Sequence, residues 1–179
     1  FSRALELDPG STEARRMRGD AYWSLAVFDR AADEYRAVVS IEADDADAWL
    51  GLGEAQLELG RVQDAILSAQ RALELDSSMS EARLLLGRVR NAMGDAEGAR
   101  AEIEAAIEQS PEMDLLYVER SRLSQASGRP FLAWRDAQWA IDYNDGCVDA
   151  YVQRGRLALE LQTASEALDD LDRALDLDP

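Results

Sequence analysis

Few side chains of this 179-residue sequence could do catalytic chemistry. It contains no histidine and no lysine, and all 19 of its basic residues are arginine. These absences exclude Ser-His-Asp and Cys-His catalysis, histidine-bearing metal sites, lysine Schiff bases and Walker-type phosphate loops. The single cysteine, Cys147, cannot form an internal disulfide and has no histidine or lysine to activate it. We therefore expect no enzyme activity, no cofactor and no metal site.

Two short motifs have the residue types of binding sites but not their context. The aspartates Asp44, Asp45 and Asp47 lack the glycine and the terminal glutamate of a calcium-binding EF-hand loop. They stand where a helix is expected to begin, so we interpret them as capping residues. The run Gly51-x-Gly53 is not preceded by a strand, which a dinucleotide fingerprint requires.

The charge of the chain limits its partners. Against the arginines stand 36 acidic residues, so the formal net charge is -17 and the isoelectric point is near 4.3. Nucleic acid and anionic membrane surfaces are polyanions, and a protein this acidic would repel them. No apolar run is long enough to span a bilayer, so membrane insertion is not expected. Alternatively, the acidity simply keeps the protein soluble.

The elements that must position any site follow from an internal repeat. Alanine recurs at one constant interval, at residues 31, 65, 99, 133 and 167. Glycine recurs at the same interval at residues 19, 53, 87 and 155, with serine at residue 121. A fixed period of this length indicates an array of stacked supersecondary units.

Within each unit the apolar residues recur at helical spacing. In the clearest unit, one helix is expected at about 46–59 and a second at about 63–76, with Gly60 ending the first in a left-handed conformation. Gly94 and Gly128 repeat this stop signal, and Ser80 or Asp114 could cap the helix that follows.

Small residues at fixed positions of the repeat have a packing role. Gly53 and Ala65 should allow the two helices of a pair to approach closely. Each pair leaves an apolar edge that it cannot bury alone, so neighbouring pairs must stack. No segment resembles a strand, and the predicted fold is an all-α solenoid.

This pattern resembles the tetratricopeptide repeat family, whose 34-residue signature is W-x2-L-G-x2-Y, then A-x3-F, then P. The best unit reads Trp49-x2-Leu52-Gly53-x2-Gln56 and then Ala65-x3-Ala69, while the first reads Arg15-x2-Arg18-Gly19-x2-Tyr22 and then Ala31-x3-Tyr35. The resemblance covers the whole chain. It implies a right-handed α-solenoid of stacked antiparallel helix pairs, with repeats at 12–45, 46–79, 80–113, 114–147 and 148–179. Residues 1–11 would then hold the second helix of a preceding, truncated repeat, and the array is expected to continue in the full-length protein.

The resemblance also implies a site. Arrays of this family hold extended peptides or partner segments on a concave groove that is lined by the first helix of each pair. The groove positions carry a charged row, an aliphatic row and a third row that is mixed. In this sequence they are Glu54, Arg88, Arg122 and Arg156; Leu50, Leu84, Val118 and Val152; and Trp23, Asn91 and Gln125.

Two interpretations of these rows stay open. The arginines could grip carboxylates or backbone carbonyls of a ligand while its apolar side chains rest on the aliphatic row. Alternatively, the arginines pair within the protein with acids such as Glu81 and Asp149, and the aliphatic residues pack between helices. Trp139 also has two interpretations, since it could anchor a partner or pack against a neighbour.

Two classes of function follow. The chain is either a protein-protein interaction scaffold that binds a peptide or partner segment along its groove, or a regulatory or substrate-docking arm of a larger multidomain enzyme such as a kinase or glycosyltransferase. The terminal helices should also expose apolar edges, through residues such as Phe1, Leu168 and Leu175. Exposed edges of this kind favour end-to-end self-association.

Overall fold

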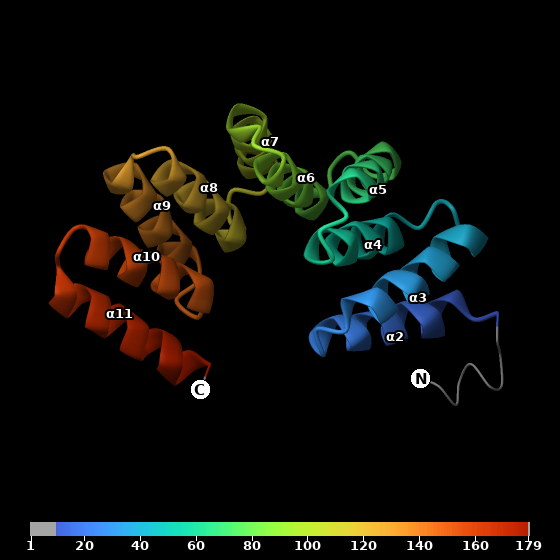
Figure 1. Ribbon diagram of the computed structural model, residues 1–179, viewed down its shortest axis with the longest axis horizontal. Coiled ribbons are helices and arrows are strands. Elements are labelled where there is room, and N and C mark those ends of the chain that lie inside the picture. The colour runs from blue at the N-terminus through green and yellow to red at the C-terminus, as the bar shows by residue number, and fades with distance from the viewer. Residues whose placement is uncertain (1–9, 179) are drawn as a thin grey trace. The chain divides into compact units, whose positions relative to one another are not determined.

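The computed structural model describes residues 10–178, and every regular element in that range is an α-helix (Figure 1). The helices follow one another in adjacent pairs, which confirms the expected all-α architecture. Their bounds are α2 (Thr12–Ser24), α3 (Phe28–Ile41), α4 (Ala46–Glu58), α5 (Val62–Leu75), α6 (Ser80–Ala92), α7 (Ala96–Gln109), α8 (Asp114–Ala126), α9 (Pro130–Tyr143), α10 (Val148–Glu160) and α11 (Ala164–Leu177). The helix expected at residues 1–9 lies outside the described residues.

The helices form two compact units, one ending at Asp95 and one beginning at Ala96. In the first unit, α2 packs with α3 and α4 with α5, and each pair also contacts the first helix of the pair that follows. In the second unit, α8 packs with α9 and α10 with α11, and α9 also contacts α10. The first helices are neighbours as well: α4 contacts α2 and α6 in the first unit, and α8 contacts α10 in the second.

Glycines end the first helices as predicted. Gly60, Gly94 and Gly128 have φ values of 69°, 83° and 69°, in the left-handed region that glycine adopts without a steric penalty. The same register in the first and last repeats holds Ala26, with φ of 53°, and Gln162, with φ of 63°. Two turns of the array therefore carry a side chain where the backbone favours none.

The helix starts agree only partly with the sequence-based expectation. Asp45 caps α4, since its carboxylate accepts a hydrogen bond from the Ala48 amide at 2.9 Å. The expected caps at Ser80 and Asp114 are wrong, because these residues are the first residues of α6 and α8. The positions before them hold Met79 and Met113, which provide no side-chain cap.

Small residues hold the helices of a pair close together. The five repeat-marking alanines are at most 1% exposed. A Cβ atom on Gly53 would lie 3.4 Å from the Ala65 carbonyl oxygen, which confirms the predicted approach of α4 and α5. It would lie even closer to the next pair, at 2.8 Å from Leu85 Cδ2. Glycine at this position therefore admits a helix of the following pair as well as its own partner helix.

Candidate functional site

Two of the three predicted groove arginines lie on the adjacent helices α8 and α10 of the second unit. Arg122 donates to Asp149 at 2.7 Å, from one first helix to the next, and it contacts Glu119 at 3.4 Å. The Arg122–Asp149 pair is open to solvent, with 37% and 55% of the two side chains exposed. Exposed pairs of this kind contribute between zero and about 1 kcal/mol to stability, so an incoming carboxylate can replace Asp149 at little cost. Arg156 is exposed.

The charged row of the first unit has a different character. Burial is the largest influence on Glu54 and raises the pKa of its carboxyl. The Arg88 guanidinium lowers that pKa, and the carboxylates of Glu81 and Glu58 raise it again. Glu54 is therefore a half-buried acid with one nearby cation and two nearby anions.

The aliphatic row is less accessible than a ligand-binding surface would need. Leu84 is 4% exposed and Val118 is 1% exposed. Leu50 is half-buried and packs against the core cluster that contains Ala65 and Leu85. Val152 is also half-buried, but it lines an apolar cavity at the last helix pair. Most of this row contributes to packing between helices.

The third row is mixed in the structure too. Trp23 is half-buried, and its ring makes an edge-on contact with Phe28 at a centroid distance of 5.0 Å. Asn91 is exposed. Gln125 is half-buried, and both polar atoms of its amide have partners: the nitrogen donates to Glu160 at 2.6 Å and the oxygen accepts from Gln153 at 2.8 Å.

An ion pair that the sequence analysis missed joins the two helices of a repeat. Arg120 of α8 donates two hydrogen bonds to Asp136 of α9, at 3.0 and 2.9 Å. The same bidentate pair recurs in the next repeat between Arg154 and Asp170. A third pair in this register, Arg18 with Glu34, lies in the first repeat at 2.7 Å.

A signal for these pairs was present in the sequence. In the three repeats concerned, arginine replaces the leucine of the family signature, and an acid stands at one fixed position of the helix that follows. In the second repeat, which keeps Leu52, that later position holds Ser68 instead of an acid. The third repeat keeps Leu86 and still has an acid, Glu102, at that position, so the arginine in place of the leucine, and not the acid, marks the repeats that form the pair.

Aromatic rings surround these arginines. The Arg120 guanidinium lies 5.3 Å from the centre of the Tyr117 ring and 5.6 Å from that of Trp139. Trp139 is 38% exposed and makes an edge-on contact with Tyr117 at 5.9 Å. Trp139 therefore packs against a neighbour and keeps one part of its ring open to solvent.

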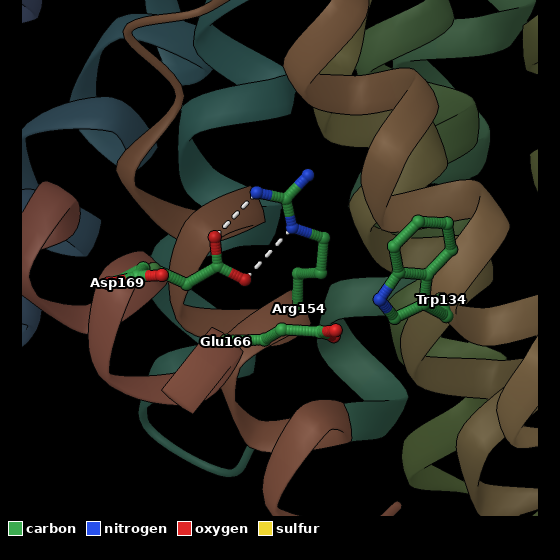
Figure 2. A pocket seen from close by; sticks show the side chains of 5 residues that line it. Trp134, Arg154, Glu166 and Asp169 are labelled. Carbon is green, nitrogen blue, oxygen red and sulfur yellow. Dashed lines mark hydrogen bonds and ion pairs between the residues drawn. The ribbon is translucent and has the colours of Figure 1, made fainter. Parts of the chain in front are cut away.

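A small cavity borders the second of the bidentate pairs (Figure 2). It measures about 230 Å³ and is lined by Trp134, Arg154, Glu166, Asp169 and Asp170. Figure 2 shows Arg154 between the Trp134 indole and the acidic side chains of α11. Asp170 already binds Arg154, so these polar groups at the cavity serve the ion pair between α10 and α11.

The remaining chemistry-bearing residue is Cys147, which lies at the start of α10. The side chain is 5% exposed, and burial raises the pKa of its thiol to about 12. A protonated, buried thiol is a poor nucleophile and a poor metal ligand. Residues 10–178 contain no cluster of acids and cysteine that could hold a metal ion. No helix of this range combines the length and hydrophobicity that a membrane-spanning helix needs.

Comparisons with known families give one consistent result. A sequence profile of the tetratricopeptide repeat matches residues 16–80 and 119–179, and a second profile of the same repeat matches residues 60–119.

The curated relatives are distant and much longer. The chain is 28% identical over 80 residues to anaphase-promoting complex subunit 3 of Schizosaccharomyces pombe, which covers 45% of this chain and 12% of that protein. It is 24% identical over 173 residues to tetratricopeptide repeat protein 16 of Homo sapiens, which covers 93% of this chain and 20% of that protein. The chain thus spans a fifth or less of the length of either relative.

Solved structures show the same fold. A thermophilic TPR protein of Thermus thermophilus superposes with a TM-score of 0.89 at 19% identity, over 94% of this chain and 92% of that one. YrrB, described as a TPR protein with an unusual peptide-binding site, superposes with a TM-score of 0.62 at 18% identity, over 100% of this chain and 92% of that one.

Proposed function

Because the chain belongs to the tetratricopeptide repeat family, we propose that it is a protein-protein interaction module that binds an extended peptide segment on the first helices of its repeats. The fold is that of a family of interaction scaffolds, and the matching family profiles describe a helical repeat, not an enzyme. YrrB is described as having a peptide-binding site, which supports the idea that this fold can hold a peptide.

The observation that carries the proposal is the exposed pair of Arg122 and Asp149 on the adjacent helices α8 and α10. The guanidinium is held at the surface by a neighbouring carboxylate that solvent already reaches. A peptide carboxylate can take the place of Asp149 and gain a charge-assisted hydrogen bond from Arg122. Arg156, exposed on the second of the two helices, offers a further cation to the same ligand.

The burial of Leu84 and Val118 changes the ligand that we expect. These side chains offer a ligand almost no surface, so apolar anchoring along the aliphatic row is small. Recognition should therefore depend on hydrogen bonds and charge. The net charge of -17 disfavours a strongly acidic segment at long range, so the proposed ligand carries one or two carboxylates and is otherwise neutral.

A peptide selection tests the proposal. Twelve-residue peptides are selected from a phage-display library on the full chain, and their binding is measured by fluorescence anisotropy. Arg122→Ala should weaken binding by about 1–3 kcal/mol, because it removes a charge-assisted hydrogen bond. The matched control is Arg173→Ala, which removes an exposed arginine from the second helix α11.

The thermal midpoint is measured in the same variants. Breaking the exposed pair with Asp149 should cost little, but Arg122→Ala also removes a partner of the buried Glu119 carboxylate, so a small fall in the midpoint is expected. If the selected peptides bind Arg122→Ala and Arg173→Ala as tightly as the unmodified protein, this face is not the binding site. If Arg122→Ala instead lowers the midpoint strongly and leaves binding intact, the arginine is structural.

A further inference from the structure

A cavity of the first unit is lined by three successive helices, α3, α4 and α5, and measures about 420 Å³. Four of the residues that line it are apolar: Val39 of α3, Trp49 and Leu52 of α4, and Leu67 of α5. Helix α2 packs with α3, and helix α6 packs with α5. The helices around the cavity therefore have their neighbours in the array on both sides, and the cavity lies within the array and not at one of its ends. We call it the α3–α5 cavity.

The fifth repeat fills the corresponding space with an ion pair. Leu52 and Ser68 stand at the positions that Arg154 and Asp170 hold in the fifth repeat. Arg154 donates to Asp170 of α11 (Figure 2) and to Gln138 of α9, so that one side chain of α10 joins three helices. Leu52 and Ser68 cannot form such a bridge, and the space is about 420 Å³ in the second repeat against about 230 Å³ in the fifth.

An exposed leucine belongs to the lining of the α3–α5 cavity. Leu67 is 64% exposed, although it is a large apolar residue. The same position of the other repeats holds a charged or small residue, namely Asp33, Ala101, Arg135 and Asp169. Leu67 and the Trp49 ring thus provide apolar surface beside an open cavity, and apolar surface of this kind marks binding sites.

A buried amide gives the cavity a polar group. Gln56 lines the cavity and is 6% exposed. Its Oε1 atom accepts from the Ser68 hydroxyl at 2.7 Å. Within residues 10–178 the amide nitrogen of Gln56 has no hydrogen-bond partner. Because buried donors are nearly always paired, this nitrogen is available to a carbonyl oxygen of an occupant.

The charges at the cavity favour a basic occupant. Arg36 and Asp64 are the charged residues that line it. Arg36 pairs with Asp33 at 2.7 Å, whereas Asp64 is exposed and, within residues 10–178, takes part in no ion pair or side-chain hydrogen bond. The net charge of -17 adds a long-range attraction for cations.

We infer that the α3–α5 cavity binds an aromatic side chain of a partner protein, at a point where a basic residue stands next to the aromatic one. An aromatic side chain supplies a large apolar area and packs well against another ring, so it would lie against Trp49 and Leu67. The backbone of the partner segment would accept from Gln56, and its basic residue would pair with Asp64. This site is distinct from the first-helix surface around Arg122 and goes beyond the proposed function.

The probe is the peptide acetyl-Gly-Arg-Trp-Arg-Gly-amide, added to the full 179-residue chain labelled with ¹⁵N. The chain has 4 tryptophans, so its indole N–H signals are few, and Trp49→Phe assigns that of Trp49. The Trp49 indole, which donates to the Ala43 carbonyl at 3.0 Å, should shift until the site is saturated. The Trp134 signal, which comes from the second unit, should stay in place. A peptide with Ala instead of Trp should cause no saturable shift.

Two leucine variants locate the binding site. Leu67→Ser should weaken the peptide about five-fold, because it removes apolar contact area without adding a charge. Leu168→Ser is the matched control: Leu168 also lies in a second helix and is 62% exposed, but it does not line the α3–α5 cavity. It should change binding less than about two-fold. The double variant Leu52→Arg/Ser68→Asp copies the ion pair of the fifth repeat into the second, and it should abolish binding while the thermal midpoint shows that the fold is kept.

The charge of the partner is tested separately. Asp64→Asn should weaken the peptide about three-fold, which is the scale of an exposed ion pair. Asp172→Asn is its control, since it removes one exposed acid from α11 and changes the net charge equally. The peptide acetyl-Gly-Glu-Trp-Glu-Gly-amide should bind the unmodified chain at least about five-fold more weakly than the arginine peptide does.

Four results would overturn the inference. They are a Trp49 signal that does not shift, equal binding by Leu67→Ser and Leu168→Ser, full binding by a folded Leu52→Arg/Ser68→Asp variant, and equal binding of the arginine and glutamate peptides. None of these outcomes involves Arg122, so the inference and the proposed function can fail separately.

Discussion

Arg120 and Asp136 join the two helices of one repeat by two parallel hydrogen bonds, and Arg154 and Asp170 do the same in the next repeat. Asp136 is 2% exposed, so its charge is buried and depends on the arginine for compensation. In this register the second repeat has Leu52 and Ser68 instead. The repeats therefore fill this register in more than one way, ionic in the fourth and fifth repeats and largely apolar in the second.

Replacing one partner of the Arg120–Asp136 pair should lower the unfolding free energy strongly, and replacing both should not. Arg120→Leu leaves the Asp136 carboxylate buried without a counter-charge, so we expect a loss of about 3 kcal/mol of unfolding free energy. The double variant Arg120→Leu/Asp136→Ser copies the second repeat and should lie within about 1 kcal/mol of the unmodified protein. Urea denaturation measures these variants. Arg71→Leu, which breaks an exposed pair with Glu74, is the control for loss of one arginine and should cost little.

The coupling energy between Arg120 and Asp136, obtained from the single and double variants, decides the question. The cycle also needs the single variant Asp136→Ser. If the double variant loses as much unfolding free energy as Arg120→Leu and Asp136→Ser lose together, the two residues do not stabilise each other, and the recurrence of the pair has another cause.

The helices and the glycines that end the first helices could be predicted from the sequence because their signals are local, whereas the caps expected at Ser80 and Asp114 were wrong. Alanine at residue 65 predicts a close contact between helices, and glycine at residue 60 predicts a left-handed turn. The structure has both the contact and the turn. The Arg120–Asp136 pair was missed because its partners stand far apart in the chain on different helices, at a separation that no helical period shows.

The accessibility of the site was harder to predict, because it depends on how deeply neighbouring helices pack. Val118 and Val152 hold the same position in successive repeats, yet the first is 1% exposed and the second lines an open cavity. The difference comes from α10, which covers Val118, and not from either residue type. The ligand contacts of Arg122 and Arg156 stay a prediction.

Glu54 should make stability fall as the pH rises above the ordinary carboxyl range. Burial raises the pKa of its carboxyl above the usual 4.5. Between the unfolded and the folded pKa the folded state binds more protons than the unfolded state, so the free energy of unfolding decreases with increasing pH. Glu54→Gln removes this dependence, and its stability relative to the unmodified protein should rise as the pH increases above the ordinary carboxyl pKa.

Urea denaturation at several pH values measures the difference. Glu108→Gln, which removes an exposed acid from α7, controls for the loss of one negative charge. A Glu54→Gln curve parallel to that of the unmodified protein would show that the Glu54 carboxyl is not perturbed.

Cys147 should be nearly inert in the folded protein. With a pKa of about 12, about one thiol in 10,000 is ionised at pH 8, whereas a thiol at the ordinary value of 9.0 is ionised in about one case in ten. Alkylation by iodoacetamide at pH 8 should therefore be at least about 100-fold slower in the native protein than in urea. Equal rates in the two conditions would mean that α10 opens freely and that its contact with α9 is weak.

Gln162 offers a direct gain in stability. It occupies the turn between α10 and α11 with a φ of 63°, where a side chain is strained. Gly128, one repeat earlier, has a φ of 69° in the equivalent turn. Gln162→Gly removes the strain but adds flexibility to the unfolded chain, and the balance should be a gain of about 0.5–1 kcal/mol.

The reciprocal variant Gly128→Gln is the matched control, because it places the same side chain in the same turn of the preceding repeat. It should lower the thermal midpoint, while Gln162→Gly should raise it, and calorimetry of both variants measures the two shifts. A lower midpoint in Gln162→Gly would show that the Gln162 side chain contributes more to the turn than its backbone strain costs. Opposite shifts in the two variants would show that the backbone conformation, which recurs from repeat to repeat, decides which residue each turn prefers.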